Sequence, residues 1–113
     1  MDFEKLMVWQ RAKRLTVAVY EEMAPCRDLT LRSQITRSAL SVPSNIAEGM
    51  ERFSIKEKCQ FLWIAKALCG ELRTQIMIGR EIGYISDSFA ANWIPESREL
   101  SNMLCGLIKK ISN

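Results

Sequence analysis

Histidine is absent from this 113-residue chain, and glycine and proline are scarce, with five and three residues. Without histidine the chain cannot build a Ser–His–Asp triad, a histidine general base or a zinc–histidine site. Few turn-forming residues imply few connections between elements. The composition therefore excludes several common enzyme classes and favours a small number of long elements.

Nucleotide-binding loops and paired cysteines are missing as well. The sequence has neither G-x-x-x-x-G-K-[ST] nor G-x-G-x-x-G, and its four cysteines form no C-x-x-C pair. We therefore expect no enzymatic activity, no metal and no cofactor. We also expect free thiols and a cytoplasmic location, because the N-terminus lacks the apolar run of a signal peptide and no 18-residue apolar stretch could span a membrane.

The overall composition is that of one globular domain covering residues 1–113. Hydrophobic residues make up 48% and charged residues 26% of the chain, and a domain of this length buries roughly two thirds of its unfolded surface. The net charge of +3 permits binding to nucleic acid but does not require it.

The segment SVPSNIAEG, from Ser41 to Gly49, lies in a helical pattern with two different faces. Pro43 should kink this helix or start it. The polar face is open to two interpretations: it is solvated, or it makes hydrogen bonds to a closely packed neighbour, with Arg37 and Asn45 as the best candidates. One face is apolar, with Ile35, Ala39, Val42, Ile46, Gly49 and Phe53, and the other is polar, with Gln34, Arg37, Ser38, Ser41, Asn45, Glu48 and Arg52.

Apolar periodicity and capping residues predict four helices, over residues 3–23, 29–50, 55–82 and 87–111. Asp28 (or Thr30), Ser54 and Ser86 (or Asp87) are the expected N-caps, and Gly83 is the expected C-cap. Pro95 predicts a kink or break near Trp93. No strand pattern competes, so the predicted fold is an all-α, up-down-up-down antiparallel four-helix bundle.

The first three helices carry more apolar and small residues than one bundle can bury. Trp63, Ala67 and Gly70 form a second stripe on the third helix, where small residues would let another backbone come close. We therefore predict a homo-oligomer. The oligomer interface, or a structural polar stripe, is expected at Arg37, Ser41, Asn45, Glu48, Trp63, Ala67 and Gly70.

Basic residues are concentrated on two of the predicted helices. Lys66, Arg73 and Arg80 repeat every seven residues and should lie along one face. Such a face is either simply solvated or binds phosphates, and a ring of copies would multiply its charge. The candidate nucleic-acid or partner-binding residues are Arg11, Lys13, Arg14, Lys66, Arg73 and Arg80.

The central segment resembles the signature of the four-helix-bundle family of the ribosomal RNA intervening-sequence protein, which is similar in fold to the Avd accessory proteins of diversity-generating retroelements. Further matches are LMVWQRA, FLWIA, ELRTQ and Gly83-Tyr84-Ile85. The resemblance implies a ring, a homopentamer in particular. Its Avd branch implies binding to RNA or DNA and to a reverse transcriptase.

Together these observations predict a non-enzymatic, homo-oligomeric binding protein that uses a basic surface for nucleic acid, a reverse-transcriptase-type partner or both. The alternative is a structural or protein-interaction adaptor without affinity for nucleic acid. An enzyme is the third possibility.

Overall fold

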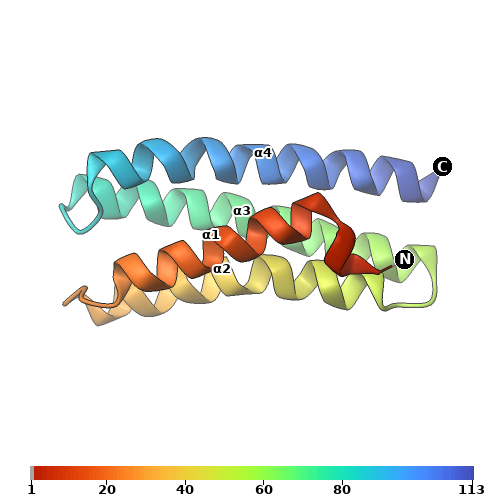
Figure 1. Ribbon diagram of the computed structural model, residues 1–113, viewed down its shortest axis with the longest axis horizontal. Helices are drawn as coiled ribbons and strands as arrows, with labels where there is room; N and C mark the ends of the chain where they lie inside the picture. Colours follow the sequence, from red (N-terminus) through yellow and green to blue (C-terminus); the bar gives the residue numbers. More distant parts are fainter. Residues whose placement is uncertain (1) are drawn as a thin grey trace.

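The computed structural model describes residues 2–113, which form an elongated bundle of four antiparallel α-helices (Figure 1). The bundle measures 43 × 20 × 20 Å. Neighbours in sequence are neighbours in space, with α1 on α2, α2 on α3 and α3 on α4, whereas α1 and α4 meet over a much smaller area. The predicted all-α four-helix bundle is confirmed. The elements are the 3-10 helix η1 (Phe3–Lys5), α1 (Met7–Met23), α2 (Leu29–Met50), α3 (Ile55–Glu81) and α4 (Asp87–Ser112).

The core consists of one apolar stripe from each helix. The predicted apolar stripe of α2 is correct in its central part and wrong at Phe53, which is 100% exposed because α2 ends at Met50. Tyr20 of α1 and Ile55 of α3, which helical spacing also places with apolar neighbours, are 44% and 56% exposed. The fully buried large side chains are Val19 and Met23 of α1, Ile35, Val42 and Ile46 of α2, Leu62, Cys69, Leu72 and Ile76 of α3, and Leu100 and Leu104 of α4.

Local capping bonds fix where the helices begin and end. Asp28, Ser54 and Ser86 each accept a hydrogen bond from the backbone N–H three residues later, at 2.9–3.2 Å. Gly83 follows α3 with a φ of 85°, in the left-handed region that glycine adopts without steric cost. The predicted N-caps of α2, α3 and α4 are therefore confirmed, and the predicted C-cap Gly83 lies one residue after the observed C-cap, Ile82.

The N-terminal helix is interrupted at Leu6, where one continuous helix was expected. Leu6 is extended, with a ψ of 126°, and separates η1 from α1. The ring of Phe3 packs edge-on against Trp9 at 5.3 Å, and the Gln10 side-chain amide donates to the Glu4 carbonyl at 2.9 Å. These contacts fold the first turn back onto α1.

Pro43 lies buried in the middle of α2, which starts at Leu29 and continues through it. The proline has no N–H, so the carbonyl of Ala39, four residues earlier and only 2% exposed, lacks its usual helical donor. The Thr16 hydroxyl of α1 takes that place, with Oγ1 2.8 Å from the Ala39 oxygen and 2.8 Å from the Ala12 oxygen of its own helix. A neighbouring helix thus satisfies the carbonyl that the proline leaves free.

Pro95 does not break α4, which runs unbroken from Asp87 to Ser112. The carbonyl that loses its helical donor belongs to Ala91, an exposed residue, so water can donate to it. Of the predicted kink or break, the break does not occur, because solvent can satisfy the freed backbone group; the kink stays a prediction.

α2 and α3 approach closely at Gly49, where a Cβ would lie 2.8 Å from the Phe61 Cβ and 3.2 Å from the Lys58 carbonyl oxygen of α3. A hydrogen atom at this position therefore lets the two helices meet. Gly79 of α3 makes room for the α3–α4 connection instead, because a Cβ there would lie 2.5 Å from the Ile85 side chain.

The four cysteines are free thiols. Within residues 2–113, no three histidine, cysteine or acidic side chains gather closely enough to hold a metal ion. In the same range, no helix is both long and apolar enough to cross a membrane.

We predict that Thr16→Val destabilises the protein by about 1–3 kcal/mol, because the buried Ala39 carbonyl then has no donor. In a Pro43→Ala background the restored N–H can bond that carbonyl, so the cost of Thr16→Val should fall by at least about 1 kcal/mol. Urea unfolding of the four proteins measures this coupling. Thr36→Val is the control, since its hydroxyl bonds only its own helix. Equal costs in both backgrounds would contradict the explanation.

Candidate nucleic-acid interface

The three basic residues of α3 lie on its flank next to α4. Cys69, buried at the α3–α4 contact, lies beside Ser101 of α4 and within electrostatic reach of Arg73 and Lys66. Burial raises the pKa of the Cys69 thiol to about 11, while Ser101 and the two positive charges act in the opposite direction. Arg80 follows Arg73 by seven residues and continues the same row.

Two further cations on α4 adjoin this row, and they are not among the predicted binding residues. Arg98 and Lys109 are exposed and share a stripe with Ser101 and Cys105, at spacings of three and four residues. Because Ser101 faces Cys69, that stripe borders α3. The spacing was visible in the sequence, but the rotation of α4 that turns it toward α3 was not.

We call Lys66, Arg73, Arg80, Arg98 and Lys109 the basic flank. Within residues 2–113, the structure forms ion pairs only between Arg11 and Glu96 and between Arg52 and Glu48. The cations of the basic flank therefore have no carboxylate within salt-bridge distance. Acidic residues are close along the chain at two places: Glu81 and Asp87 follow Arg80 at the end of α3 and the start of α4, and Glu99 comes directly after Arg98.

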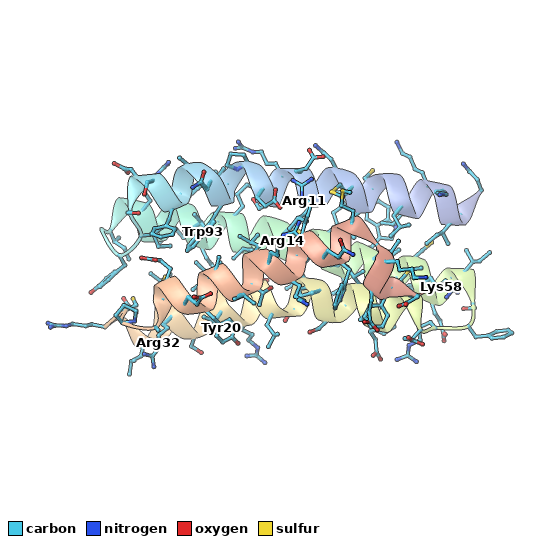
Figure 2. All side chains as sticks on the ribbon, in the orientation of Figure 1. Arg11, Arg14, Tyr20, Arg32, Lys58 and Trp93 are labelled. Atoms are coloured by element: carbon cyan, nitrogen blue, oxygen red, sulfur yellow. The ribbon has the colours of Figure 1, made fainter. Side chains whose placement is uncertain are left out.

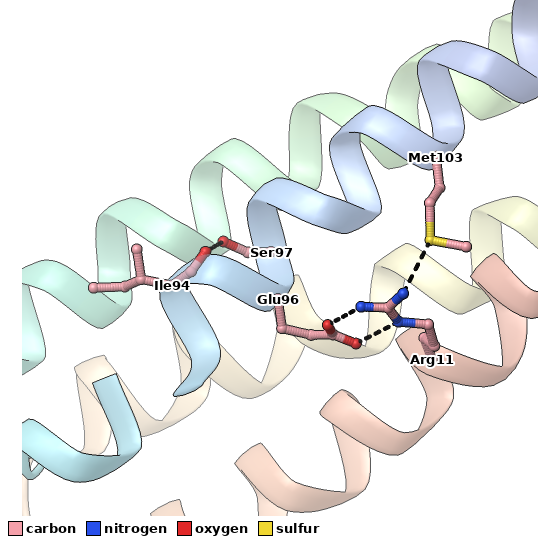
Figure 3. A network of polar contacts seen from close by, with 5 residues as sticks. All are labelled: Arg11, Ile94, Glu96, Ser97 and Met103. Atoms are coloured by element: carbon pink, nitrogen blue, oxygen red, sulfur yellow. Dashed lines mark hydrogen bonds and ion pairs between the residues drawn. The ribbon is translucent and has the colours of Figure 1, made fainter. Parts of the chain in front are cut away.

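Arg11, a predicted binding residue, is engaged inside the molecule (Figure 3). Its guanidinium donates two hydrogen bonds to the carboxylate of Glu96 on α4, and the one from Nε to Oε2 measures 2.9 Å. The Nη1 atom of Arg11 also lies 3.7 Å from the sulfur of Met103. The hydrogen bond from Arg11 holds the pKa of Glu96 below its usual value. This pair joins α1 and α4 where they pack only loosely.

The other two α1 cations lie apart from the basic flank. The Lys13 ammonium sits 5.1 Å from the centre of the Trp9 ring, and Lys13 and Arg14 line an open hollow of about 390 Å³ that also includes Glu4. Within residues 2–113, α1 and α3 are diagonal in the bundle and their backbones do not come close to each other. The six predicted basic residues therefore do not form one surface, although the three on α3 lie in one row. Figure 2 shows Arg11 and Arg14 on α1.

The polar stripe of α2 bonds mainly to its own helix. Ser41 donates to the Arg37 carbonyl at 2.8 Å, Asn45 donates to the Ser41 carbonyl at 2.7 Å, and Glu48 pairs with Arg52. Arg37 and Glu48 are exposed. The solvated interpretation therefore fits Arg37 and Glu48, whereas Ser38 of the predicted polar face is buried. Within residues 2–113, no hydrogen bond of Ser41, Asn45 or Glu48 crosses to another helix.

The predicted small-residue stripe of α3 is largely open to solvent. Trp63 is 50% exposed with the Lys66 ammonium 5.7 Å from its ring centre, Ala67 is exposed, and Gly70 is partly exposed. Ile64 and Ile78 beside it are each about half exposed. α3 therefore presents an apolar outer face, next to the basic flank, that this single chain does not cover.

A model of the 23S rRNA-intervening sequence protein family matches residues 4–106. The chain is also similar to a crystal structure of a protein with unknown function from the S23 ribosomal protein family of Bacteroides thetaiotaomicron. The TM-score is 0.85 at 21% identity, over 91% of this chain and 99% of the other. No curated protein matches the chain. At that identity, the structural similarity shows the fold alone.

We predict that Glu96→Gln lowers the unfolding free energy by about 1 kcal/mol at pH 7, because both partners are only 27% exposed and the pair is bidentate. The pKa of Glu96 is lowered in the folded state, so the stabilisation is present above about pH 4.3, the unfolded value, and disappears as the pH falls through the folded value. The difference between wild type and variant should therefore vanish in acid.

Denaturant unfolding between pH 3 and pH 7 measures this difference. Glu99→Gln is the matched control, because Glu99 acts on Arg11 only through its charge. A Glu96→Gln difference that persists unchanged at pH 3 would show that the ion pair is not its source.

Proposed function

The chain belongs to the 23S rRNA-intervening sequence protein family, and from this premise we propose that it is a non-enzymatic, self-associating protein that binds nucleic acid along α3. The observation that carries the proposal is the row Lys66, Arg73 and Arg80, exposed or half-buried cations without a carboxylate within salt-bridge distance. Arg11 and Arg52, by contrast, are paired with Glu96 and Glu48 of the same chain.

Phosphate binding is the chemistry that such a row serves best. Lysine and arginine side chains release counterions from a nucleic-acid backbone when they bind it, and this supplies a sequence-independent affinity. The family name refers to an intervening sequence of 23S rRNA, so RNA is the first nucleic acid to test.

Self-association is supported by apolar surface on two sides of the bundle. Trp63, Ile64 and Ile78 are exposed on α3, whereas Val17 and Leu40 are exposed on α1 and α2. Two different apolar faces suit a contact between unlike surfaces of neighbouring copies, which closes into a ring when the rotation allows. A ring of five, which the sequence resemblance implies, stays a prediction.

A protein-interaction adaptor is the second candidate, favoured by the same apolar face of α3. In that case a partner protein, such as one of the reverse-transcriptase type, would cover Trp63 and Ala67, and the basic flank would be solvated. The two candidates differ in whether the isolated protein binds RNA.

We predict that light scattering of the purified protein gives a mass that is a multiple of 13.0 kDa, and that Trp63→Ser shifts it toward a single copy. Phe53→Ser is the matched control, because Phe53 is fully exposed on the α2–α3 connection, away from the α3 face. A wild-type mass of one chain at micromolar concentration would contradict self-association.

We predict that labelled RNA binds at low salt and that binding weakens more than about tenfold between 50 and 200 mM salt, as several phosphate contacts require. Replacing Lys66, Arg73 and Arg80 by glutamine should remove three phosphate contacts and weaken binding strongly. The control replaces Lys5, Arg27 and Lys56, which are exposed elsewhere, and removes the same net charge. No binding of RNA or DNA at 50 mM salt would favour the adaptor.

A further inference from the structure

The basic flank has the shape of two nearly parallel rows. α3 and α4 lie side by side (Figure 1), so the α3 row of Lys66, Arg73 and Arg80 runs next to the α4 row of Arg98 and Lys109. Seven residues of α-helix advance about 10.5 Å and rotate the side chain by only about 20°. The α3 row is therefore about 21 Å long and nearly straight, and packed helices are about 8–10 Å apart.

The surface between the rows offers charge but no aromatic ring. Cys69 is buried there, Ser101 and Cys105 are half-buried, and Gly70 borders the α3 side. The nearest exposed ring, Trp63, lies at the edge with the Lys66 ammonium over it. Single strands are held mainly by stacking of bases on aromatic side chains, and within residues 2–113 the basic flank provides no such platform.

The rigidity of α3 and α4 also favours a double helix as the ligand. The cations project from two long helices, so their spacing is fixed before any ligand arrives. A double helix presents its phosphates on a stiff scaffold with a persistence length of about 50 nm, and it carries about one charge per 1.7 Å of axis. A flexible single strand would have to be ordered along the rows and would present fewer charges per length.

From this geometry we propose that the basic flank binds the sugar-phosphate backbone of a nucleic-acid double helix, in preference to a single strand and without reading its sequence. The inference rests on the proposed function and names the ligand class of the same surface. Arg98 and Lys109 of α4 contribute as much to phosphate binding as the three cations of α3. One duplex can therefore contact both rows at once.

The test compares a 20-base-pair RNA duplex with each of its separated strands, by fluorescence anisotropy between 50 and 200 mM salt. Five phosphate contacts predict a slope of about −4.5 for log K against log salt with the duplex, which is a loss of about 500-fold in affinity over this range. Arg73→Gln and Arg98→Gln should each reduce the magnitude of the slope by about 0.9. A second duplex of unrelated sequence should bind with the same affinity.

Arg27→Gln is the matched control, because Arg27 is exposed on the α1–α2 connection and its loss changes the net charge equally. It should leave the slope unchanged. Single strands bound as tightly as the duplex would overturn the duplex inference and leave the proposed function standing. No binding of either form at 50 mM salt would overturn both. An Arg98→Gln slope equal to that of wild type would remove α4 from the surface.

Discussion

The close approach of α2 and α3 is the constraint on which the rest of the bundle depends. At Gly49 a side chain would collide with the Cβ of Phe61 on α3, so these two helices pack at this distance because glycine stands there. Their contact and the contact of α3 with α4 are the two largest in the bundle. α3 is therefore the central helix, flanked on both sides, and its outward face is the one that remains for other molecules.

α1 is held against the other three helices more by specific polar contacts than by a large packed area. On one side the Thr16 hydroxyl bonds the Ala39 carbonyl that Pro43 leaves without a helical donor. On the other side Arg11 pairs with Glu96. The proline in α2 thus creates a requirement that only a donor at one level of α1 can meet, and this fixes how α1 sits along α2. Pro95 in α4 imposes no such requirement, because the freed carbonyl of Ala91 lies at the solvent-exposed side.

The helices and their caps could be predicted from the sequence because both depend on residues three or four positions apart. The apolar stripe through Ile35, Val42 and Ile46 and the N-cap at Ser54 are signals of this local kind. Two other features depend on how each helix is rotated in the bundle, which the sequence does not reveal. These are the pairing of Arg11 with a glutamate 85 positions away and the position of Arg98 on the side of α4 that borders α3. The repeat of Lys66, Arg73 and Arg80 was visible locally, but its extension onto α4 required the packing of two helices.

The arrangement of charge and apolar surface on α3 would allow the proposed assembly and the proposed binding to coexist in one small protein. Ile78 and Ile82 border α2, where they line a hollow of about 370 Å³ with Leu31, whereas Lys66 and Arg73 border α4. Trp63 and Gly70 lie between them. Copies that meet through the part that borders α2 would leave the α4 side open and would bring several basic flanks into one particle. A contact over Trp63, by contrast, would also cover the Lys66 ammonium, 5.7 Å from its ring centre. Because each added phosphate contact multiplies affinity, a chain whose net charge is only +3 would gain most of its affinity from being repeated.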